Sequence, residues 1–181
     1  EYQISIVIPT IDTELQKLSI EKDSFLKNNI QVIISNEEFI KNCTDKIKTF
    51  DFFDSMQLRS PKILDNKNLK FPCFMKSKKG SSSIGAKEVK SPNDLSFNQL
   101  NDKNNIFQEL VSNKFIEYSA DLYFDRQSKL CSNVVRERVE TRNGEISKGI
   151  TRKNKVYEYI NNNFKYLEGA KGPITLQLFS D

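Results

Sequence analysis

A loop rich in glycine and serine, residues 77–85, has the residue types best suited to phosphate chemistry in this chain. It lies between two strand-like runs, 71–76 and 86–89, and it contains Gly80, Ser81, Ser82, Ser83 and Gly85. Small residues let backbone N–H groups approach an anion, and lysines at 76, 78, 79 and 87 add positive charge. The pattern predicts a phosphate-binding loop, and a mobile connection between two strands is the alternative.

The spacing of the loop glycines matches only half of a Walker A motif. Gly80 and Gly85 fit G-x-x-x-x-G, but Ala86-Lys87-Glu88 follows where Walker A has Gly-Lys-Ser/Thr. The magnesium-binding hydroxyl is therefore missing, and a strand follows where the motif needs a helix. Nothing in the sequence resembles the H-R-D or D-F-G elements of protein kinases, and histidine is absent. Both of these phosphate-loop families are disfavoured.

Composition narrows the possible chemistry further. The 181 residues, 37% of them hydrophobic, are enough for one domain or two small subdomains, and the net charge of +4 argues against a dedicated nucleic-acid binder. Without histidine, a bound metal would need oxygen ligands, which favours Mg²⁺ or Mn²⁺. No apolar run reaches the roughly 20 residues of a membrane span. The three cysteines lack zinc-site spacing. No signal peptide is recognised, so we expect a cytoplasmic location and reduced thiols.

The first 43 residues read as strand, helix and strand. The run 4–9 is almost entirely apolar, as in a strand buried on both faces of a parallel sheet. A helix is expected to follow to about residue 26, capped by Thr10 or Asp12, and a second strand is expected over 31–35. This β-α-β unit is typical of a fragment of a nucleotide-binding-like sheet.

The rest of the chain alternates helices and strands, which predicts an α+β fold. Helices are expected over 37–42, 45–56, about 91–100 and 156–167, and strands over 106–111, 118–124, 131–140, 147–151 and 175–179.

The order of these segments resembles the ATP-grasp superfamily, with the closest likeness to the large chain of carbamoyl phosphate synthase and related carboxylate–amine ligases. The motifs that carry the resemblance are Thr44-Asp45-Lys46, the run 71–76, Gly80 to Gly85, the run 107–111, the run 117–121 and the run 172–177. The resemblance implies an ATP-grasp fold of two α+β subdomains, at 44–105 and 106–181, the second of them truncated. Residues 1–43 would be the end of a preceding Rossmann-like α/β domain.

The resemblance also implies roles for individual residues. Lys46 and Lys76 would contact nucleotide phosphates, and the glycine–serine loop would close over them as a lid. Glu109, Leu110 and Val111 would meet adenine as a hinge, and Glu117 would accept hydrogen bonds from ribose. Gln177 would be a Mg²⁺ ligand, although a hydrogen bond within the core is a rival interpretation for this amide.

Two arginines are the candidate catalytic residues. Arg136 and Arg138 alternate along an expected strand, which places both on one face. They are suited to clamp an acyl phosphate or a substrate carboxylate in bidentate fashion. The alternative is a salt-bridged surface with Glu137 and Glu140.

The function implied by the resemblance is ATP-dependent carbon–nitrogen ligation through an acyl phosphate. The partners would be ATP with Mg²⁺ (or Mn²⁺), a small carboxylate or bicarbonate, and an amine or ammonia, with a homodimer as a possible assembly and no nucleic acid or membrane partner. The metal-binding Glu-x-Asn strand of the family would follow Asp181, so we expect an internal fragment that is inactive by itself. A non-catalytic nucleotide-binding or regulatory module is the alternative, and a binder of RNA is a weaker one.

Overall fold

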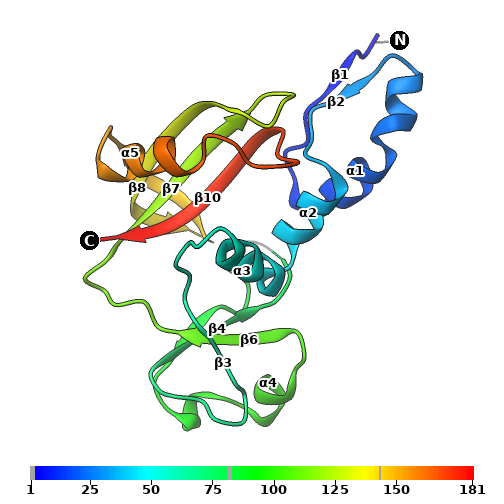
Figure 1. Ribbon diagram of the computed structural model, residues 1–181. Helices are drawn as coiled ribbons and strands as arrows, with labels where there is room; N and C mark the ends of the chain where they lie inside the picture. Colours follow the sequence, from blue (N-terminus) through cyan, green and yellow to red (C-terminus); the bar gives the residue numbers. More distant parts are fainter. Residues whose placement is uncertain (1–2, 81–82, 143) are drawn as a thin grey trace. The chain divides into compact units, whose positions relative to one another are not determined.

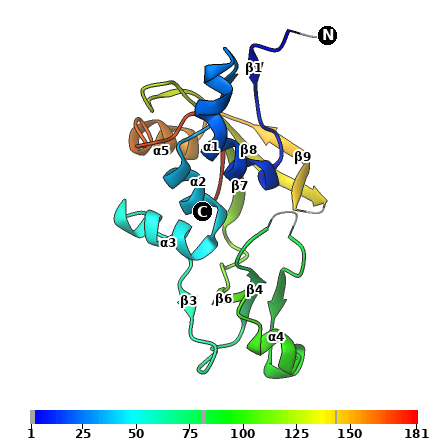
Figure 2. The ribbon, with the colours of Figure 1, turned by 90° about the vertical axis from the view of Figure 1, so that its right-hand side faces the viewer.

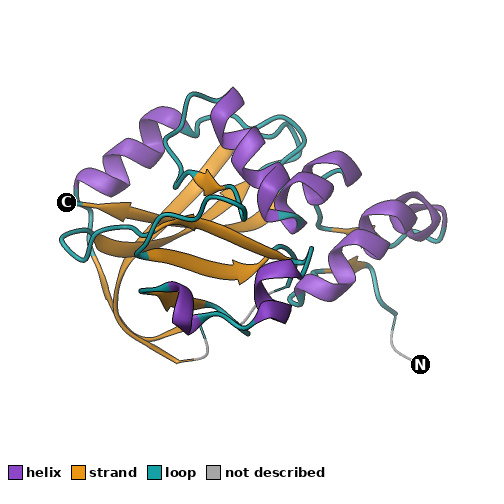
Figure 3. Cartoon of the chain, turned by 90° about the horizontal axis from the view of Figure 1, so that it is seen from below, coloured by secondary structure: helices purple, strands orange, loops and turns teal. Residues whose placement is uncertain are grey.

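The computed structural model describes residues 3–80, 83–142 and 144–181 of the chain. Its contacts divide it into two compact units. Unit 1 comprises Glu1–Lys41, Phe115–Arg142 and Ile146–Asp181, and unit 2 comprises Asn42–Lys114 with Asn143–Glu145. Helices and strands are mixed in both, as Figure 3 shows by colour, so the expected α+β class is confirmed. The predicted three-part division at residues 43 and 105 stays a prediction.

Unit 1 contains a four-stranded antiparallel sheet in the order β10-β7-β8-β9 (Figure 1). The strands are β7 (Ile116–Phe124), β8 (Leu130–Arg142), β9 (Glu145–Thr151) and β10 (Gly172–Ser180). The pairing of β10 with β7 runs from Gly172 opposite Phe124 to Ser180 opposite Ile116. This continuous register fixes which side chains of the two strands share a face.

One face of this sheet is covered by an apolar core. Alternation along β7 turns Tyr118, Ala120 and Leu122 to this side, and each is buried. Helix α5 (Lys155–Asn163) contacts β8, and it buries Val156 and Ile160. The helix begins where the Asn154 side chain accepts hydrogen bonds from two backbone N–H groups of its first turn. The residues of the opposite face are largely polar.

The N-terminal part of unit 1 is the expected β-α-β unit. Strand β1 (Ile6–Val7) pairs in parallel with β2 (Gln31–Val32), and helix α1 (Asp12–Lys27) connects them. The predicted burial of the first strand on both faces is wrong, because Ile4, Ile6 and Ile8 are 59%, 55% and 59% exposed. A two-stranded sheet covers less apolar surface than the larger parallel sheet from which that burial was inferred.

The start of α1 also differs from the expectation. The residue at the N-cap is Ile11, which makes no side-chain capping bond, and Asp12 is the first helical residue. Thr10 precedes the cap, so neither predicted residue caps the helix. Asp12 still favours the helix, because a carboxylate in the first turn interacts well with the helix dipole. The predicted end is confirmed, since Asn28 is the C-cap and Asn29 has a φ of 61°.

Helix α2 (Glu37–Thr44) begins against a close backbone approach within unit 1. The Asn36 side chain accepts a hydrogen bond from the Phe39 N–H at 2.8 Å, and the Asn36 N–H donates to the Gly169 carbonyl at 2.9 Å. A Cβ on Gly169 would lie 2.4 Å from the Asn36 amide, and the φ of Gly169 is +79°. Glycine is therefore required at position 169, where the segment that precedes β10 meets the start of α2.

Unit 2 is built on a second four-stranded sheet, in the order β3-β6-β4-β5, whose strands β3, β4 and β6 are labelled in Figure 2. The strands are β3 (Ile63–Leu64), β4 (Cys73–Ser77), β5 (Lys87–Val89) and β6 (Asn105–Glu109). Cys73, Met75, Val89 and Phe107 form its buried core. Strands β4 and β5 flank the glycine–serine loop, as predicted.

The remaining elements of unit 2 are short. Helix α3 (Lys46–Ser55) precedes the sheet. The single helix expected over 91–100 is instead a 3₁₀ turn, η1 (Pro92–Asp94), followed by α4 (Phe97–Asn101). The break falls at Ser96, whose side chain caps α4 by accepting a hydrogen bond from the Gln99 N–H. A capping serine begins a new helix in place of continuing the old one.

Candidate functional site

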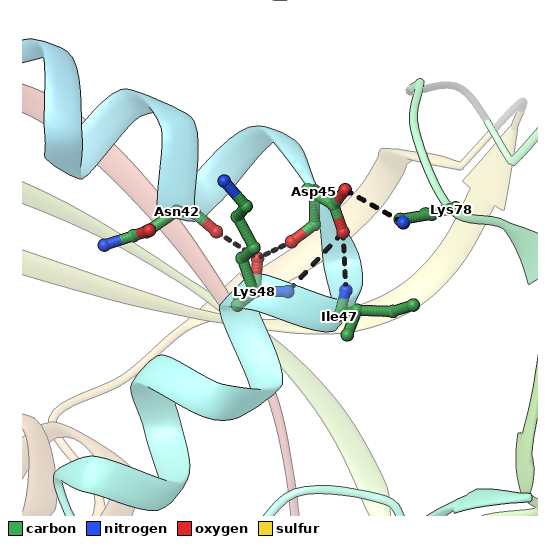
Figure 4. Close-up of polar contacts among 6 residues, drawn as sticks. Asn42, Asp45, Ile47, Lys48 and Lys78 are labelled. Atoms are coloured by element: carbon green, nitrogen blue, oxygen red, sulfur yellow. Dashed lines mark hydrogen bonds and ion pairs between the residues drawn. The ribbon is translucent and has the colours of Figure 1, made fainter.

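The start of helix α3 is organised by one buried carboxylate (Figure 4). Asp45 is 6% exposed, and its Oδ1 accepts hydrogen bonds from the backbone N–H groups of Ile47 at 3.0 Å and Lys48 at 3.5 Å. The Thr49 hydroxyl donates to the carbonyls of Asn42 and Asp45 at 2.8 and 3.0 Å. This capping fixes Lys46 as the first residue of the helix.

Lys46 connects this helix to the glycine–serine loop. Its backbone N–H donates to the Lys78 carbonyl at 3.0 Å, and its ammonium donates to the Gly80 carbonyl at 2.9 Å. Gly80 has a φ of +102°, a conformation that favours glycine. The first leg of the loop therefore lies against the first turn of α3, which brings Lys46 to the loop. Its predicted contact with nucleotide phosphates stays a prediction.

Lys76 is the second lysine that the structure brings to this place. It lies on β4, one residue before the strand ends, and its ammonium is 4.9 Å from the centre of the Phe50 ring. Burial is the main cause that lowers the pKa of Lys76 to about 8, and the nearby charge of Lys46 lowers it further. Two ammonium groups close enough to interact electrostatically form a place suited to an anion with several negative charges.

The rest of the glycine–serine loop is only partly described. Ser81 and Ser82 were predicted to bind phosphate, and both lie outside the described residues. Ser83 and Gly85 are exposed and have positive φ values of 52° and 72°, and the Ala86 N–H donates to the Ser83 carbonyl at 3.0 Å. The second leg of the loop is thus a tight turn, and the phosphate contacts of its residues stay a prediction.

The predicted adenine hinge begins where β6 ends. The Glu109 N–H donates to the Lys62 carbonyl at 2.9 Å, which holds Glu109 in the sheet. Leu110 and Val111 follow the strand and are half-buried, although the sequence had suggested a strand as far as Val111. Their backbone groups lie outside the ladder of the sheet, and a role in binding adenine stays a prediction.

In unit 1, Arg138 is held by two residues of the neighbouring strand. Its Nη1 donates to the Ser119 hydroxyl at 2.9 Å, and its Nε lies 3.3 Å from the Glu117 carboxylate. The Arg138 side chain is only 5% exposed, whereas that of Glu117 is 34% exposed. Arg138 is thus a buried and charge-paired residue, and the Glu117 carboxylate, predicted to accept from ribose, has this arginine as a neighbour.

Arg136 is the more exposed of the two predicted arginines. Its side chain is 38% exposed, and its Nη2 donates to the Asp121 carboxylate. The other oxygen of Asp121 accepts from the Thr175 hydroxyl at 3.0 Å. The three residues come from β8, β7 and β10, so three strands fix the orientation of one guanidinium group.

Gln177 lies on the same face of the sheet, in register with Ser119. Gln177 is exposed, so the rival interpretation as an amide buried in the core is wrong. Along strand β10, half-buried residues alternate with exposed ones, and Gln177 is one of the exposed residues. Among the described residues there is no group of three or more carboxylate or thiol side chains that could hold a metal. Gln177 would add one neutral oxygen to a Mg²⁺ ion that arrives bound to ATP phosphates, whose remaining ligands would be phosphate and water oxygens.

Four residues of these two groups lie within the motifs named above but had no predicted role. Ser119 and Asp121 contact Arg138 and Arg136 directly. Thr175 contacts Asp121, and Asp45 caps the helix that begins at Lys46. Alternation could have placed Ser119 and Asp121 on the face of Glu117. Thr175 could not be found in this way, because its position opposite Asp121 depends on the register of two strands far apart in sequence.

In the described parts of the chain, no helix is both long enough and apolar enough to span a membrane.

Comparison by sequence finds no protein-family model that matches the chain. It likewise finds no characterised protein with a significant match.

Comparison by structure finds many similar folds. The biotin carboxylase domain of 2-oxoglutarate carboxylase from Hydrogenobacter thermophilus, in complex with MgADP, ADP and bicarbonate, matches with a TM-score of 0.74 and 12% identity over 98% of this chain and 45% of that one. D-alanine–D-alanine ligase from Helicobacter pylori has a TM-score of 0.69 and 20% identity, over 97% of this chain and 59% of that one. L-amino acid ligase from Bacillus licheniformis has a TM-score of 0.66 and 12% identity, over 94% and 44%.

These neighbours are ATP-grasp enzymes, and the chain has the ATP-grasp fold. It spans 45% and 59% of the length of the first two of these neighbours. The resemblance inferred from the order of the motifs is confirmed at the level of the fold.

Proposed function

We propose that the chain is the ATP-binding part of an ATP-dependent carboxylate–amine ligase. The observation that carries the proposal is the convergence of Lys46 and Lys76 beside the glycine–serine loop, with the pKa of Lys76 lowered to about 8. A buried ammonium with a lowered pKa costs free energy in the empty protein, and bound phosphate relieves that cost. Lysine ammonium groups also act as point charges for phosphate oxygens.

The other nucleotide contacts of this proposal are those that the resemblance implies. Backbone groups of Glu109, Leu110 and Val111 would meet adenine, and Glu117 would accept hydrogen bonds from ribose. The serines and glycines at 80–85 would cover the phosphates. Mg²⁺ would neutralise phosphate charge when ATP is bound, with Gln177 as one of its oxygen ligands.

The acid substrate would be bound in unit 1, on the face of the sheet that carries Arg136 and Arg138. Arg136 presents a guanidinium group whose orientation is fixed by Asp121, and such a group suits carboxylate and phosphoryl oxygens. Arg138 supports this face through Ser119 and Glu117. These contacts favour roles for Arg136 in binding and for Arg138 in positioning.

The reaction would proceed in two steps. A carboxylate (or bicarbonate) oxygen attacks the γ-phosphorus of ATP, the bond to the β-phosphate oxygen breaks, and ADP leaves. An amine (or ammonia) then attacks the carbonyl carbon of the acyl phosphate, loses a proton and expels inorganic phosphate. The protein would contribute by positioning the reactants and stabilising negative charge, without covalent chemistry of its own.

The proposal is tested first by nucleotide binding. The melting temperature of the chain is measured with and without MgATP, and we expect a rise, because a ligand at 100 times its Kd stabilises the native state by about 2.7 kcal/mol. The absence of any shift, together with no heat of binding by calorimetry, would refute nucleotide binding.

A second measurement separates a ligase from a non-catalytic nucleotide-binding module. Because the chain alone is expected to be inactive, ADP release is followed for the full-length protein. Pairs of acids and amines are tested, beginning with bicarbonate and ammonia because of the likeness to carbamoyl phosphate synthase. Release that depends on both partners supports the ligase. Binding of MgATP without such release supports the module, which is the alternative.

A further inference from the structure

A third lysine lies at the place where Lys46 meets the glycine–serine loop. Lys78 is the first residue after β4, the strand that contains Lys76 and ends at Ser77. The carbonyl of Lys78 accepts the hydrogen bond from the Lys46 N–H at 3.0 Å. Lys46, Lys76 and Lys78 thus come from two adjoining segments of unit 2.

The ammonium of Lys78 is paired with the buried Asp45. The distance from the Lys78 Nζ to the Asp45 Oδ2 is 3.5 Å, and the Lys78 side chain is 33% exposed whereas that of Asp45 is 8% exposed (Figure 4). This oxygen is not the one that caps α3, because the capping bonds are made by Oδ1. The pairing with Lys78 and the capping of the helix are therefore separable functions of one carboxylate.

The backbone of Lys78 is fixed independently of this ion pair. Its N–H donates to the Asn104 carbonyl at 2.6 Å, and its carbonyl accepts from Lys46. The backbone of Lys78 is consequently held beside Lys46 even without Asp45. What Asp45 adds is a negative charge that compensates the lysine in the absence of a ligand.

We propose that Lys78 is a further polyphosphate-binding lysine, and that Asp45 is its counter-ion until phosphate replaces it. The inference rests on the proposed nucleotide site and adds to it a residue with no role assigned above. The ligand class is a di- or triphosphate group, alone or as part of a nucleotide. The Lys78 side chain is 33% exposed and can turn to a phosphate oxygen with a larger charge. Asp45 is then still compensated by the backbone N–H groups of Ile47 and Lys48.

The first experiment compares two neighbouring lysines. The affinities of the chain for MgATP, MgADP and inorganic tripolyphosphate are measured by calorimetry for the wild type, Lys78→Met and the control Lys79→Met. Lys79 is the next residue of the same loop and is exposed. We expect Lys78→Met to weaken all three ligands roughly tenfold, and Lys79→Met to weaken them less than about threefold through its distant charge. Equal losses in the two variants would overturn the proposal.

The second experiment uses Asp45→Asn. Asparagine caps helices about as well as aspartate, so the start of α3 is retained and only the charge is removed. If Asp45 competes with phosphate for Lys78, this substitution strengthens tripolyphosphate binding several-fold, and the gain is much smaller when Lys78→Met is also present. A loss of affinity, or the same gain in both backgrounds, would contradict the assigned role of Asp45.

Tripolyphosphate separates this inference from the proposed function. Binding of tripolyphosphate that depends on Lys78, without binding of MgATP or MgADP, would support the polyphosphate site and refute the nucleotide-binding function. Binding of nucleotides that is insensitive to Lys78→Met would support the function and refute the inference. Binding of none of the three ligands would refute both.

Discussion

The ammonium of Lys76 lies 4.9 Å from the centre of the Phe50 ring, so a cation–π contact joins the strand before the glycine–serine loop to helix α3. The ring covers part of the lysine and helps to keep water from it. This burial is the main cause of the lowered pKa, and it leaves the ammonium ready to gain from an anionic partner.

Removal of this ammonium should weaken nucleotide binding. We expect Lys76→Ala to lower the affinity for MgATP at least roughly tenfold, because a charge-assisted contact to phosphate is lost. The fold should remain, and circular dichroism checks it. Lys70→Ala is the control, since it removes an exposed lysine from the same unit, and an unchanged affinity in Lys76→Ala would remove Lys76 from the site.

The affinity for MgATP should depend on pH through Lys76. Its pKa of about 8 means that the ammonium is charged below pH 8 and loses its proton as the pH rises through that value. Phosphate binds the charged form, so the affinity should fall above pH 8 and stay nearly constant below it. The affinity for MgATP is measured by calorimetry between about pH 6.5 and pH 9.5. This range extends roughly 1.5 units to either side of the pKa of Lys76, and most of the titration occurs within it. A decline of the same size in Lys76→Met would exclude Lys76 as its source.

Replacement of the buried side chain of Arg138 should destabilise the protein more than replacement of the exposed side chain of Arg142. Arg138→Met removes a side chain that is 5% exposed and leaves Ser119 and Glu117 without this partner. We expect a loss of about 2 kcal/mol in the free energy of unfolding, less than for a fully buried ion pair because Glu117 is partly exposed. Arg142→Met is the control, since its side chain is 77% exposed, and it should change the stability by less than about 0.5 kcal/mol. Urea denaturation measures both, and similar losses would contradict the structural role of Arg138.

Substitutions at Asp45 should separate capping from charge. Asp45→Ala removes the acceptor for the Ile47 and Lys48 N–H groups and should cost about 1 kcal/mol of unfolding free energy. Asp45→Asn keeps that acceptor and should cost only a few tenths of a kcal/mol. Thermal denaturation of the two variants checks this, and an equal loss in both would show that the charge of Asp45, and not its hydrogen bonds, stabilises α3.

The type and order of most elements could be predicted from local features of the sequence. Apolar alternation located β7 and β10, and the expected end of the first helix, at about residue 26, lies close to the end of α1 at Lys27. The order of the motifs indicated the ATP-grasp fold, and the lysines beside the glycine–serine loop indicated phosphate. These features depend on local spacing and on residue types, which a single sequence displays directly.

Tertiary structure decided which polar groups meet. Only the register of β10 against β7 brings Thr175 to Asp121, and only the packing of α3 against the loop brings Lys46 to Gly80. The exposure of each side chain is likewise set by the tertiary structure. The side chain of Arg138 is buried, whereas Gln177 is exposed. Contacts between residues far apart in the chain depend on how whole sheets and helices pack against one another. The spacing of residues within a short segment does not specify that packing.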